Sequence, residues 1–230
     1  MEKHVLIVDD DADLSFIIKE MLTGYGYAVT CAGDGDEAFS LLTQLNYQLI
    51  ILDINLPDTD GFEICRELRR VSSVPVIFAS ARTNEDARVK GFDIGGDDYL
   101  MKPYSMKELL SRVNALMRRA YGSGEGDAVI SFGQIRIDTA ARNVIRDELN
   151  VSLSLKEFDL LAFLAKNKNK AVAKENLMAE VWGAFNEVEQ STLAVHIRWL
   201  REKLETNPAE PEYIKTVWGI GYMLEVQHET

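Results

Sequence analysis

The feature that most constrains this chain is a short apolar run that ends in an aspartate. Residues 49–52 are four consecutive apolar residues, a pattern typical of a strand buried on both faces of a parallel sheet. Asp53 follows directly, and Pro57 and Gly61 bound the loop after it. Ligands of open α/β sheets bind at the carboxyl ends of strands, so Asp53 is a candidate site residue. A lone aspartate in this position would more often only begin a turn.

Strands and helices alternate through the first half of the chain. An apolar run at residues 4–8 precedes apolar residues at helical spacing from Leu14 to Leu22, and Gly24 and Gly26 end that helix. The same reading predicts strands at 28–32, 49–52, 74–80 and 98–102, and helices at 36–45, 61–71, 87–92 and 105–119. Strand–helix units in this order predict an α/β fold, a doubly wound, flavodoxin-like parallel sheet of five strands with helices on both faces.

Carboxylates, a hydroxyl and an ammonium follow the strands of this sheet. The first strand ends at Asp9 and Asp10, the fourth at Ser80 and the fifth at Lys102. Crowded carboxylates repel one another unless a pKa rises or a hard divalent cation such as Mg²⁺ binds them. With a free oxygen on Asp53, and with Ser80 and Lys102 to hold the oxygens of a transferring phosphoryl group, these residues predict a phospho-aspartate site. Asp11 and Asp13 are expected to be a helix cap and a first-turn acid rather than metal ligands.

The second half of the chain has a different character. Residues 121–127 hold three glycines and a serine, which predicts a linker at 121–126 between a domain at 1–120 and another at 127–230. Short strands are expected between residues 128 and 153, helices at 155–166, 174–182 and 190–205, and a hairpin at 212–226. Strands, helices and a terminal hairpin in this order predict an α+β winged helix-turn-helix domain.

Composition limits the possible functions. The net charge of −12 argues against broad binding of polyanions, and residues 127–230 carry 12 Lys and Arg against 16 Asp and Glu. Any contact with nucleic acid must therefore come from a local patch. Cys31 and Cys65 are too few for a disulfide framework or a metal knot, so we expect reduced, buried thiols. Because there is neither an 18-residue apolar run nor a signal-peptide pattern, we expect a cytoplasmic protein that does not enter a membrane.

The first 120 residues resemble the receiver domain of two-component response regulators. This resemblance implies that Asp53 accepts a phosphoryl group from the histidine of a sensor kinase. It also implies that Asp10, Asp53 and the backbone carbonyl of Asn55 hold Mg²⁺, with Asp9 assisting through water. The motifs that carry it are Asp9-Asp10, Asp53 with Pro57 and Gly61, Ser80-Ala81-Arg82, and Asp97-Asp98-Tyr99 through Lys102-Pro103.

The same resemblance implies how phosphorylation changes the domain. Lys102 would bridge to the phosphorylated Asp53, Ser80 would swing to meet it, Tyr99 would turn inward, and Pro103 would follow a cis peptide bond. The surface formed by residues 87–92, the fifth strand and residues 108–119 would then become a homodimer face. Charges that could pair across its two-fold axis are those of Lys90, Asp97, Asp98, Glu108, Arg112 and Arg118; a merely solvated charged face is the alternative.

Residues 127–230 resemble the effector domain of the OmpR/PhoB class of regulators. The motifs are Lys156-Glu157-Phe158 with Leu160-Leu161, Val195-His196-Ile197, Leu200-Arg201 with Lys203-Leu204, and Ile214 through Gly219-x-Gly221-Tyr222. The resemblance implies a transcription factor that binds direct-repeat half-sites in double-stranded DNA as a dimer and works with RNA polymerase. The helix at 190–205 would enter the major groove and the hairpin would act as a wing. The candidate DNA contacts are Ser191, Thr192, Val195, His196, Arg198, Trp199, Arg201, Lys203, Lys215, Thr216 and Trp218.

Helical geometry divides the faces of that predicted recognition helix. At 100° per residue, Leu193, Ile197, Leu200 and Leu204 fall on one stripe within about 40°, which predicts the buried face. Trp199 lies on the face opposite this stripe. A DNA contact and a structural role are equally compatible with that position. The family usually has Arg at position 199, and often at the wing position 218, and an indole cannot form the bidentate fork of an Arg. We therefore expect weak binding by a monomer, strengthened on repeated sites.

Two other functional classes remain open. Asp53-x-Asn55 after an apolar strand faintly resembles the nucleophile motif of haloacid-dehalogenase-type phosphatases, but the second acid two residues after Asp53 is absent. We expect no enzyme beyond a receiver that assists its own phosphotransfer and dephosphorylation. The acidic second domain, with its tryptophans, could instead bind a protein partner and little DNA.

Overall fold

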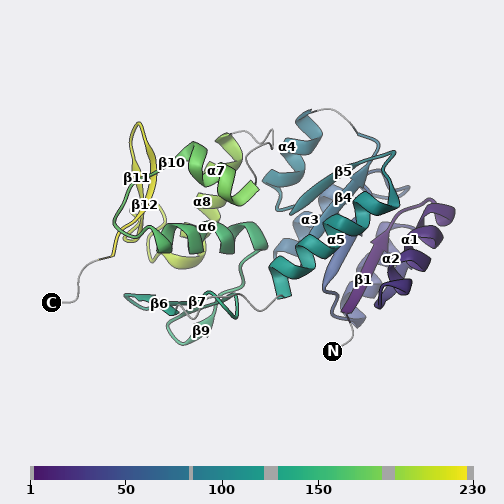
Figure 1. Ribbon diagram of the computed structural model, residues 1–230, viewed down its shortest axis with the longest axis horizontal. Coiled ribbons are helices and arrows are strands. Elements are labelled where there is room, and N and C mark those ends of the chain that lie inside the picture. The colour runs from purple at the N-terminus through teal and green to yellow at the C-terminus, as the bar shows by residue number, and fades with distance from the viewer. Residues whose placement is uncertain (1–2, 83–84, 122–128, 183–189, 227–230) are drawn as a thin grey trace. The chain divides into compact units, whose positions relative to one another are not determined.

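The chain forms two compact units, residues 1–120 and residues 121–230. The computed structural model describes residues 3–82, 85–121, 129–182 and 190–226 (Figure 1). Within these ranges no helix combines the length and the apolar character needed to cross a membrane.

Unit 1 is the predicted doubly wound parallel sheet. Its strands lie in the order β2-β1-β3-β4-β5, and every pair of neighbours is parallel. The strands are β1 (Lys3–Val8), β2 (Tyr27–Ala32), β3 (Leu49–Leu52), β4 (Val76–Ser80) and β5 (Asp98–Met101). The helices are α1 (Ala12–Gly24), α2 (Gly35–Gln44), α3 (Gly61–Arg69), α4 (Glu85–Asp93) and α5 (Met106–Tyr121), and they cover both faces of the sheet (Figure 1).

The order of the strands brings the ends of β1 and β3 together. Val5–Val8 and Leu49–Leu52 are fully or almost fully buried, which explains why both strands are apolar without alternation. In the register of this pair Val8 lies beside Leu52, and the N–H of Asp53 donates to the carbonyl of Val8 at 2.8 Å. Because β2 and β3 lie on opposite sides of β1, this edge is the topological switch point at which such folds bind ligands.

Unit 2 contains two small antiparallel sheets and three helices among its described residues. One sheet has the order β6 (Val129–Phe132), β7 (Ile135–Asp138), β8 (Asn143–Arg146) and β9 (Leu149–Asn150). The helices are α6 (Leu155–Lys166), α7 (Lys174–Trp182) and α8 (Gln190–Leu204). The other sheet has the order β10 (Val172–Ala173), β12 (Gly221–Leu224) and β11 (Ile214–Val217). The predicted winged-helix architecture is confirmed, whereas the two-residue strand β10 was not predicted.

The core of unit 2 confirms the predicted buried face of α8. Leu193 and Leu200 are fully buried, and Ile197 and Leu204 are 1% exposed. Trp182 is buried, as expected of a structural tryptophan. Gly221 is required where β12 pairs with β10, because a Cβ at this position would lie 2.1 Å from the carbonyl oxygen of Val172.

The linker prediction lies mainly outside the described residues. Residue 121 is the last residue of α5, so the helix extends beyond the predicted end at 119. Residues 122–126 are not among those that the structure describes. Of the two cysteines, Cys65 is buried and Cys31 is half-buried, and both are free thiols.

Asp97 corrects the predicted dimer face. Its carboxylate is buried inside unit 1, where it accepts from Arg69 Nη2 at 2.9 Å and from the N–H of Val76 at 3.0 Å. Arg69 also donates to the carbonyls of Gly95 and Val74. Asp97 precedes β5 and points inward against α3, so the prediction that it pairs across a dimer axis was wrong. The pair instead ties α3 to the starts of β4 and β5.

We predict that Arg69→Met destabilises unit 1 by about 3 to 5 kcal/mol, because it leaves the Asp97 carboxylate buried without its cation. Urea unfolding followed by far-UV circular dichroism measures this change. Tryptophan fluorescence should not change, since all three tryptophans lie in unit 2. The matched control is Arg70→Met, whose partner Glu67 is exposed, and a change there as large as at Arg69 would contradict the prediction.

Candidate functional site

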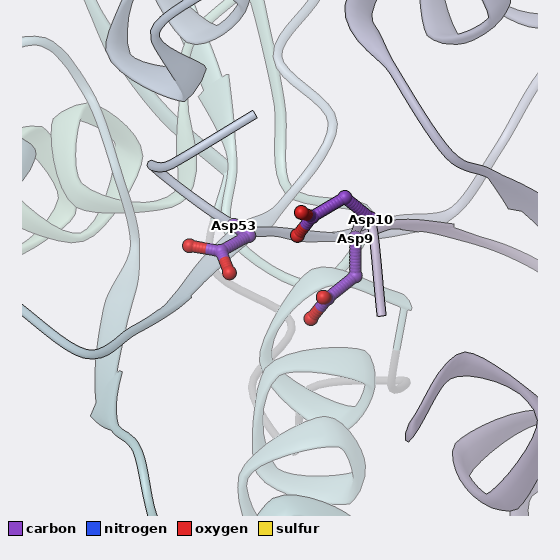
Figure 2. Close-up of side chains that lie close together, drawn as sticks. All are labelled: Asp9, Asp10 and Asp53. Atoms are coloured by element: carbon purple, nitrogen blue, oxygen red, sulfur yellow. The ribbon is translucent and has the colours of Figure 1, made fainter. Parts of the chain in front are cut away.

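Three carboxylates meet at the switch point of the sheet. Asp9 and Asp10 follow β1, Asp53 follows β3, and one oxygen of each lies within 4.8 Å of the others (Figure 2). Asp9 and Asp53 are 4% and 5% exposed, whereas Asp10 is exposed. The sequence-predicted cluster is therefore brought together, with two of its acids largely removed from water.

Lys102 supplies the countercharge. Its ammonium donates to Asp9 Oδ2 and to Asp53 Oδ2, both at 2.6 Å. Burial alone acts to lower the pKa of Lys102, but its hydrogen bonds to the two carboxylates outweigh burial and the pKa is raised. Burial raises the pKa of Asp9 although Lys102 opposes it. The peptide bond between Lys102 and Pro103 is cis, as predicted.

The donor set fits a hard divalent cation. Three carboxylates and one ammonium leave an excess of negative charge, and carboxylate oxygens are the ligands that Mg²⁺ and Ca²⁺ prefer. Asn55 stands in the loop that follows, with its N–H donating to Asp53 Oδ1 at 3.0 Å. Asp11 is instead the N-cap of α1, accepting from the N–H of Leu14, so its predicted role as a cap is confirmed.

Ser80 and Tyr99 lie beside this carboxylate cluster, and both form hydrogen bonds with the backbone of Arg82. Ser80 is fully buried at the end of β4, and its Oγ accepts from the N–H of Arg82 at 3.3 Å. The hydroxyl of Tyr99 donates to the carbonyl of Arg82 at 2.8 Å, and the ring is 6% exposed. Burial raises the pKa of Tyr99, while a hydrogen bond with Ser80 acts in the opposite direction. Tyr99 is thus already turned inward, the position expected of it after phosphorylation.

Arg82 belongs to the Ser80-Ala81-Arg82 motif, but no role was predicted for its side chain. Its Nε donates to Asn55 Oδ1 at 2.8 Å, and its Nη1 lies 3.4 Å from Asp60 Oδ2. It therefore connects the loop after β4 with the loop after β3. Its place two residues after Ser80, at the end of a predicted strand, was the available signal.

Gly61 fixes the first turn of α3 against the candidate phospho-acceptor. A Cβ at this position would lie 2.1 Å from the backbone carbonyl oxygen of Asp53, so only glycine fits. Asp60 caps the same helix by accepting from the N–H of Phe62. The loop from Asp53 to α3 is consequently held at both ends.

The candidate DNA-binding face on α8 is narrower than predicted. Ser191 and Arg198 are exposed, and Val195 and Trp199 are half-exposed. Thr192 and His196 are fully buried, because their positions adjoin the apolar stripe and turn toward the core. Each is therefore wrong as a predicted DNA contact. The imidazole of His196 packs between the rings of Trp182 and Trp199, with both centroid distances at 5.0 Å.

Three predicted cationic contacts are engaged inside unit 2. Arg201 donates to the carbonyl of Ile214 and to Thr216 Oγ1, and Lys203 Nζ donates to the buried carboxylate of Glu157 at 2.7 Å. Lys215 Nζ donates to the carbonyl of Pro211. At the turn between β11 and β12, Trp218 is 90% exposed. The wing therefore presents an aromatic side chain at the position where the OmpR/PhoB class often has Arg.

The remaining charges of the predicted dimer face lie at the surface of unit 1. Arg112 donates to Asp98 at 2.8 Å and to Glu108 at 2.9 Å. Lys90 Nζ lies 4.5 Å from the centroid of the Phe62 ring, and Arg118 is exposed. Within one chain these groups are partly neutralised by their own neighbours.

We predict that Lys102→Met in EDTA destabilises unit 1 by about 3 to 5 kcal/mol, because two buried carboxylates lose their common cation. Saturating Mg²⁺ should stabilise this variant, by about 2.7 kcal/mol at a hundred times its Kd. Urea unfolding with and without Mg²⁺ measures both effects. Lys107→Met, at an exposed position, is the control. An equal Mg²⁺ effect in the double variant Asp10→Ala, Asp53→Ala would show that the ion binds elsewhere.

Comparison with known proteins agrees with the geometry of both units. Residues 5–114 match the family model of the response regulator receiver domain, and residues 148–224 match the model described as "Transcriptional regulatory protein, C terminal". The chain is 40% identical over 235 residues to the transcriptional regulatory protein ResD of Bacillus subtilis, which covers 99% of this chain and 98% of that protein.

Further relatives agree along the whole chain. The sensory transduction protein RegX3 of Mycolicibacterium smegmatis is 38% identical over 224 residues, covering 96% of this chain and 98% of that protein. A crystal structure of the response regulator DrrB, a Thermotoga maritima OmpR/PhoB homolog, covers 98% of this chain and 100% of its own, with 31% identity and a TM-score of 0.50. The chain therefore belongs to the OmpR/PhoB family of two-component response regulators, which join a receiver domain to a DNA-binding domain.

Proposed function

We propose that this chain is a cytoplasmic transcriptional regulator whose DNA binding is controlled by phosphorylation of Asp53. The observation that carries the proposal is the contact of Lys102 with both Asp9 and Asp53 at 2.6 Å, beside the carboxylate of Asp10. A countercharge and a cation site next to a carboxylate are what phosphoryl transfer to that carboxylate requires. A sensor kinase with a phosphohistidine is the proposed donor.

In the transfer step an oxygen of Asp53 attacks phosphorus, and an acyl phosphate forms. The bond between phosphorus and the imidazole nitrogen of the donor breaks, and its electron pair stays with that nitrogen. Bound Mg²⁺, held by Asp10, Asp53 and the backbone carbonyl of Asn55, with Asp9 assisting through water, would offset charge on the phosphoryl oxygens. Lys102 holds the oxygen that faces it.

The signal then passes through Ser80 and Tyr99. Ser80 Oγ offers a hydroxyl to a phosphoryl oxygen on Asp53, and its present partner is the N–H of Arg82. The hydroxyl of Tyr99 donates to the carbonyl of the same residue, Arg82. A movement of Ser80 would therefore reach Tyr99 through Arg82 and change the packing of β5 and α4. The face that carries Lys90, Asp98, Glu108, Arg112 and Arg118 would then pair with a second copy.

We propose that the dimer binds direct repeats of double-stranded DNA and works with RNA polymerase. The groups of α8 and the wing that remain for DNA contact are Ser191, Val195, Arg198, Trp199, Thr216 and Trp218. This face carries few cations, so one copy of unit 2 contributes little affinity. Two copies linked in a dimer bind two half-sites more tightly, because binding of the first copy raises the effective concentration of the second. Apart from its own phosphotransfer and dephosphorylation, the chain is proposed to catalyse nothing.

We predict that acetyl phosphate with Mg²⁺ adds one phosphoryl group to the wild type and none to Asp53→Asn. Intact-protein mass spectrometry measures the product, and EDTA should abolish it. Gel filtration of the same samples should show a monomer before the reaction and a dimer after it. Equal phosphorylation of Asp53→Asn, or a monomer in both states, would contradict the proposal in its first or second part.

We predict that Arg198→Ala and Trp218→Ala weaken DNA binding in different ways. Arg198 is exposed and cationic, so its loss should reduce the slope of log Kd against log salt concentration by about 0.9. Trp218→Ala should weaken binding by roughly tenfold and leave that slope unchanged, because an apolar contact in a groove releases no counterion. Anisotropy titrations of fragments with one and with two half-sites measure both. A wild type without any salt dependence would favour a protein-binding module instead.

A further inference from the structure

Arg201 points from α8 toward the hairpin of β11 and β12. Its Nε and Nη2 donate to the carbonyl of Ile214 at 3.0 and 2.7 Å, and Nη2 also donates to Thr216 Oγ1 at 2.9 Å. The guanidinium lies 6.0 Å from the centroid of the Tyr222 ring on β12. One side chain of α8 thus contacts both strands of the hairpin.

Glu205 holds the same hairpin one helical turn later. Its carboxylate is 3% exposed and accepts from the N–H groups of Glu212, Tyr213 and Ile214 at 2.7, 3.0 and 2.7 Å. Both backbone polar groups of Ile214 are therefore bound by side chains from the end of α8, the N–H by Glu205 and the carbonyl by Arg201. Charge-assisted hydrogen bonds of this kind are among the stronger ones in a fold.

Arg201 and Glu205 form a brace that holds β11, the outer strand of its sheet. The β12 side of the hairpin is attached separately, since the N–H of Asn169 donates to the carbonyl of Leu224 at 2.7 Å and the N–H of Lys174 donates to the carbonyl of Ile220 at 3.2 Å. β12 pairs with β10 over only two residues, Val172 and Ala173. Beyond the brace the hairpin continues to its turn, where Trp218 is 90% exposed and Gly219 has a φ of +76°. On the β11 side, the direction in which the turn projects therefore depends on the contacts at Ile214 and Thr216.

We propose that Arg201 and Glu205 are positioning residues that fix the wing relative to α8, and that Arg201 does not act as a contact to DNA phosphates. The effect of these two residues on DNA binding rests on the proposed function, whereas the brace itself is a property of the free chain. A phosphate contact needs only a positive charge, which Lys would also supply. The brace needs the planar fork that reaches a carbonyl and a hydroxyl together, which Lys lacks.

The first test uses hydrogen exchange in the full chain without DNA. Arg201→Lys should raise the exchange rates of the amides in Lys215–Val217 by about tenfold or more, since the loss of charge-assisted bonds lets the hairpin open. Amides of α6 should keep their rates, which separates local opening from global unfolding. Arg198→Lys, at an exposed position on the same helix, is the matched control. Unchanged hairpin exchange in Arg201→Lys overturns the proposal.

The second test uses DNA fragments that the wild type selects from a genomic pool. Arg201→Lys should weaken binding by about tenfold without changing the salt slope. In the Arg201→Lys background, Trp218→Ala should reduce the affinity less than it does in the wild type, because the wing is already misplaced. Wild-type affinity in Arg201→Lys, with a slope about 0.9 smaller in Arg201→Met, would instead identify a phosphate contact. If the wild type selects no DNA, the proposed function fails, and hydrogen exchange alone decides on the brace.

Discussion

The repulsion between Asp9, Asp10 and Asp53 is the constraint on which the rest of unit 1 depends. Parallel neighbours β1 and β3 end side by side, so their following residues must share one small volume. Lys102, which follows β5, relieves part of this repulsion by contacting two of the three carboxylates. The excess negative charge leaves a place for a divalent cation. A phosphoryl group on Asp53 would alter this balance of charge, and that change is the proposed signal.

Unit 2 is an acidic domain that presents a helix, α8, and a hairpin, β11 and β12. Several of its basic side chains are used inside: Lys156 donates to the carbonyl of Val181, Lys203 to Glu157, and Arg201 to the hairpin. These contacts tie α6, α7, α8 and the hairpin to one another. In the proposed function, an acidic domain of this kind gains affinity from repeated sites and from dimerisation under the control of unit 1.

The architecture could be predicted because its signals are long and periodic, as in the unbroken apolar strands and the stripe of α8. The pocket could be predicted because strand ends in a parallel sheet converge. Asp97, Thr192 and His196 could not be placed, because a polar residue next to a buried stripe or strand faces either way according to its partners. Arg69 decides the case of Asp97 and the ring of Trp182 that of His196, and each of these partners lies on another helix. The internal contacts of Arg201 could not be predicted for the same reason, since its partners belong to the hairpin.

The measurement that tests the central claim most directly is selection of DNA from a genomic pool by the wild type and by Asp53→Asn, each with and without Mg²⁺ and acetyl phosphate. We predict that the wild type enriches fragments with repeated half-sites and that the phosphodonor strengthens this enrichment only when Asp53 is present. Enrichment that the phosphodonor strengthens equally in Asp53→Asn, or no enrichment by either protein, would contradict it.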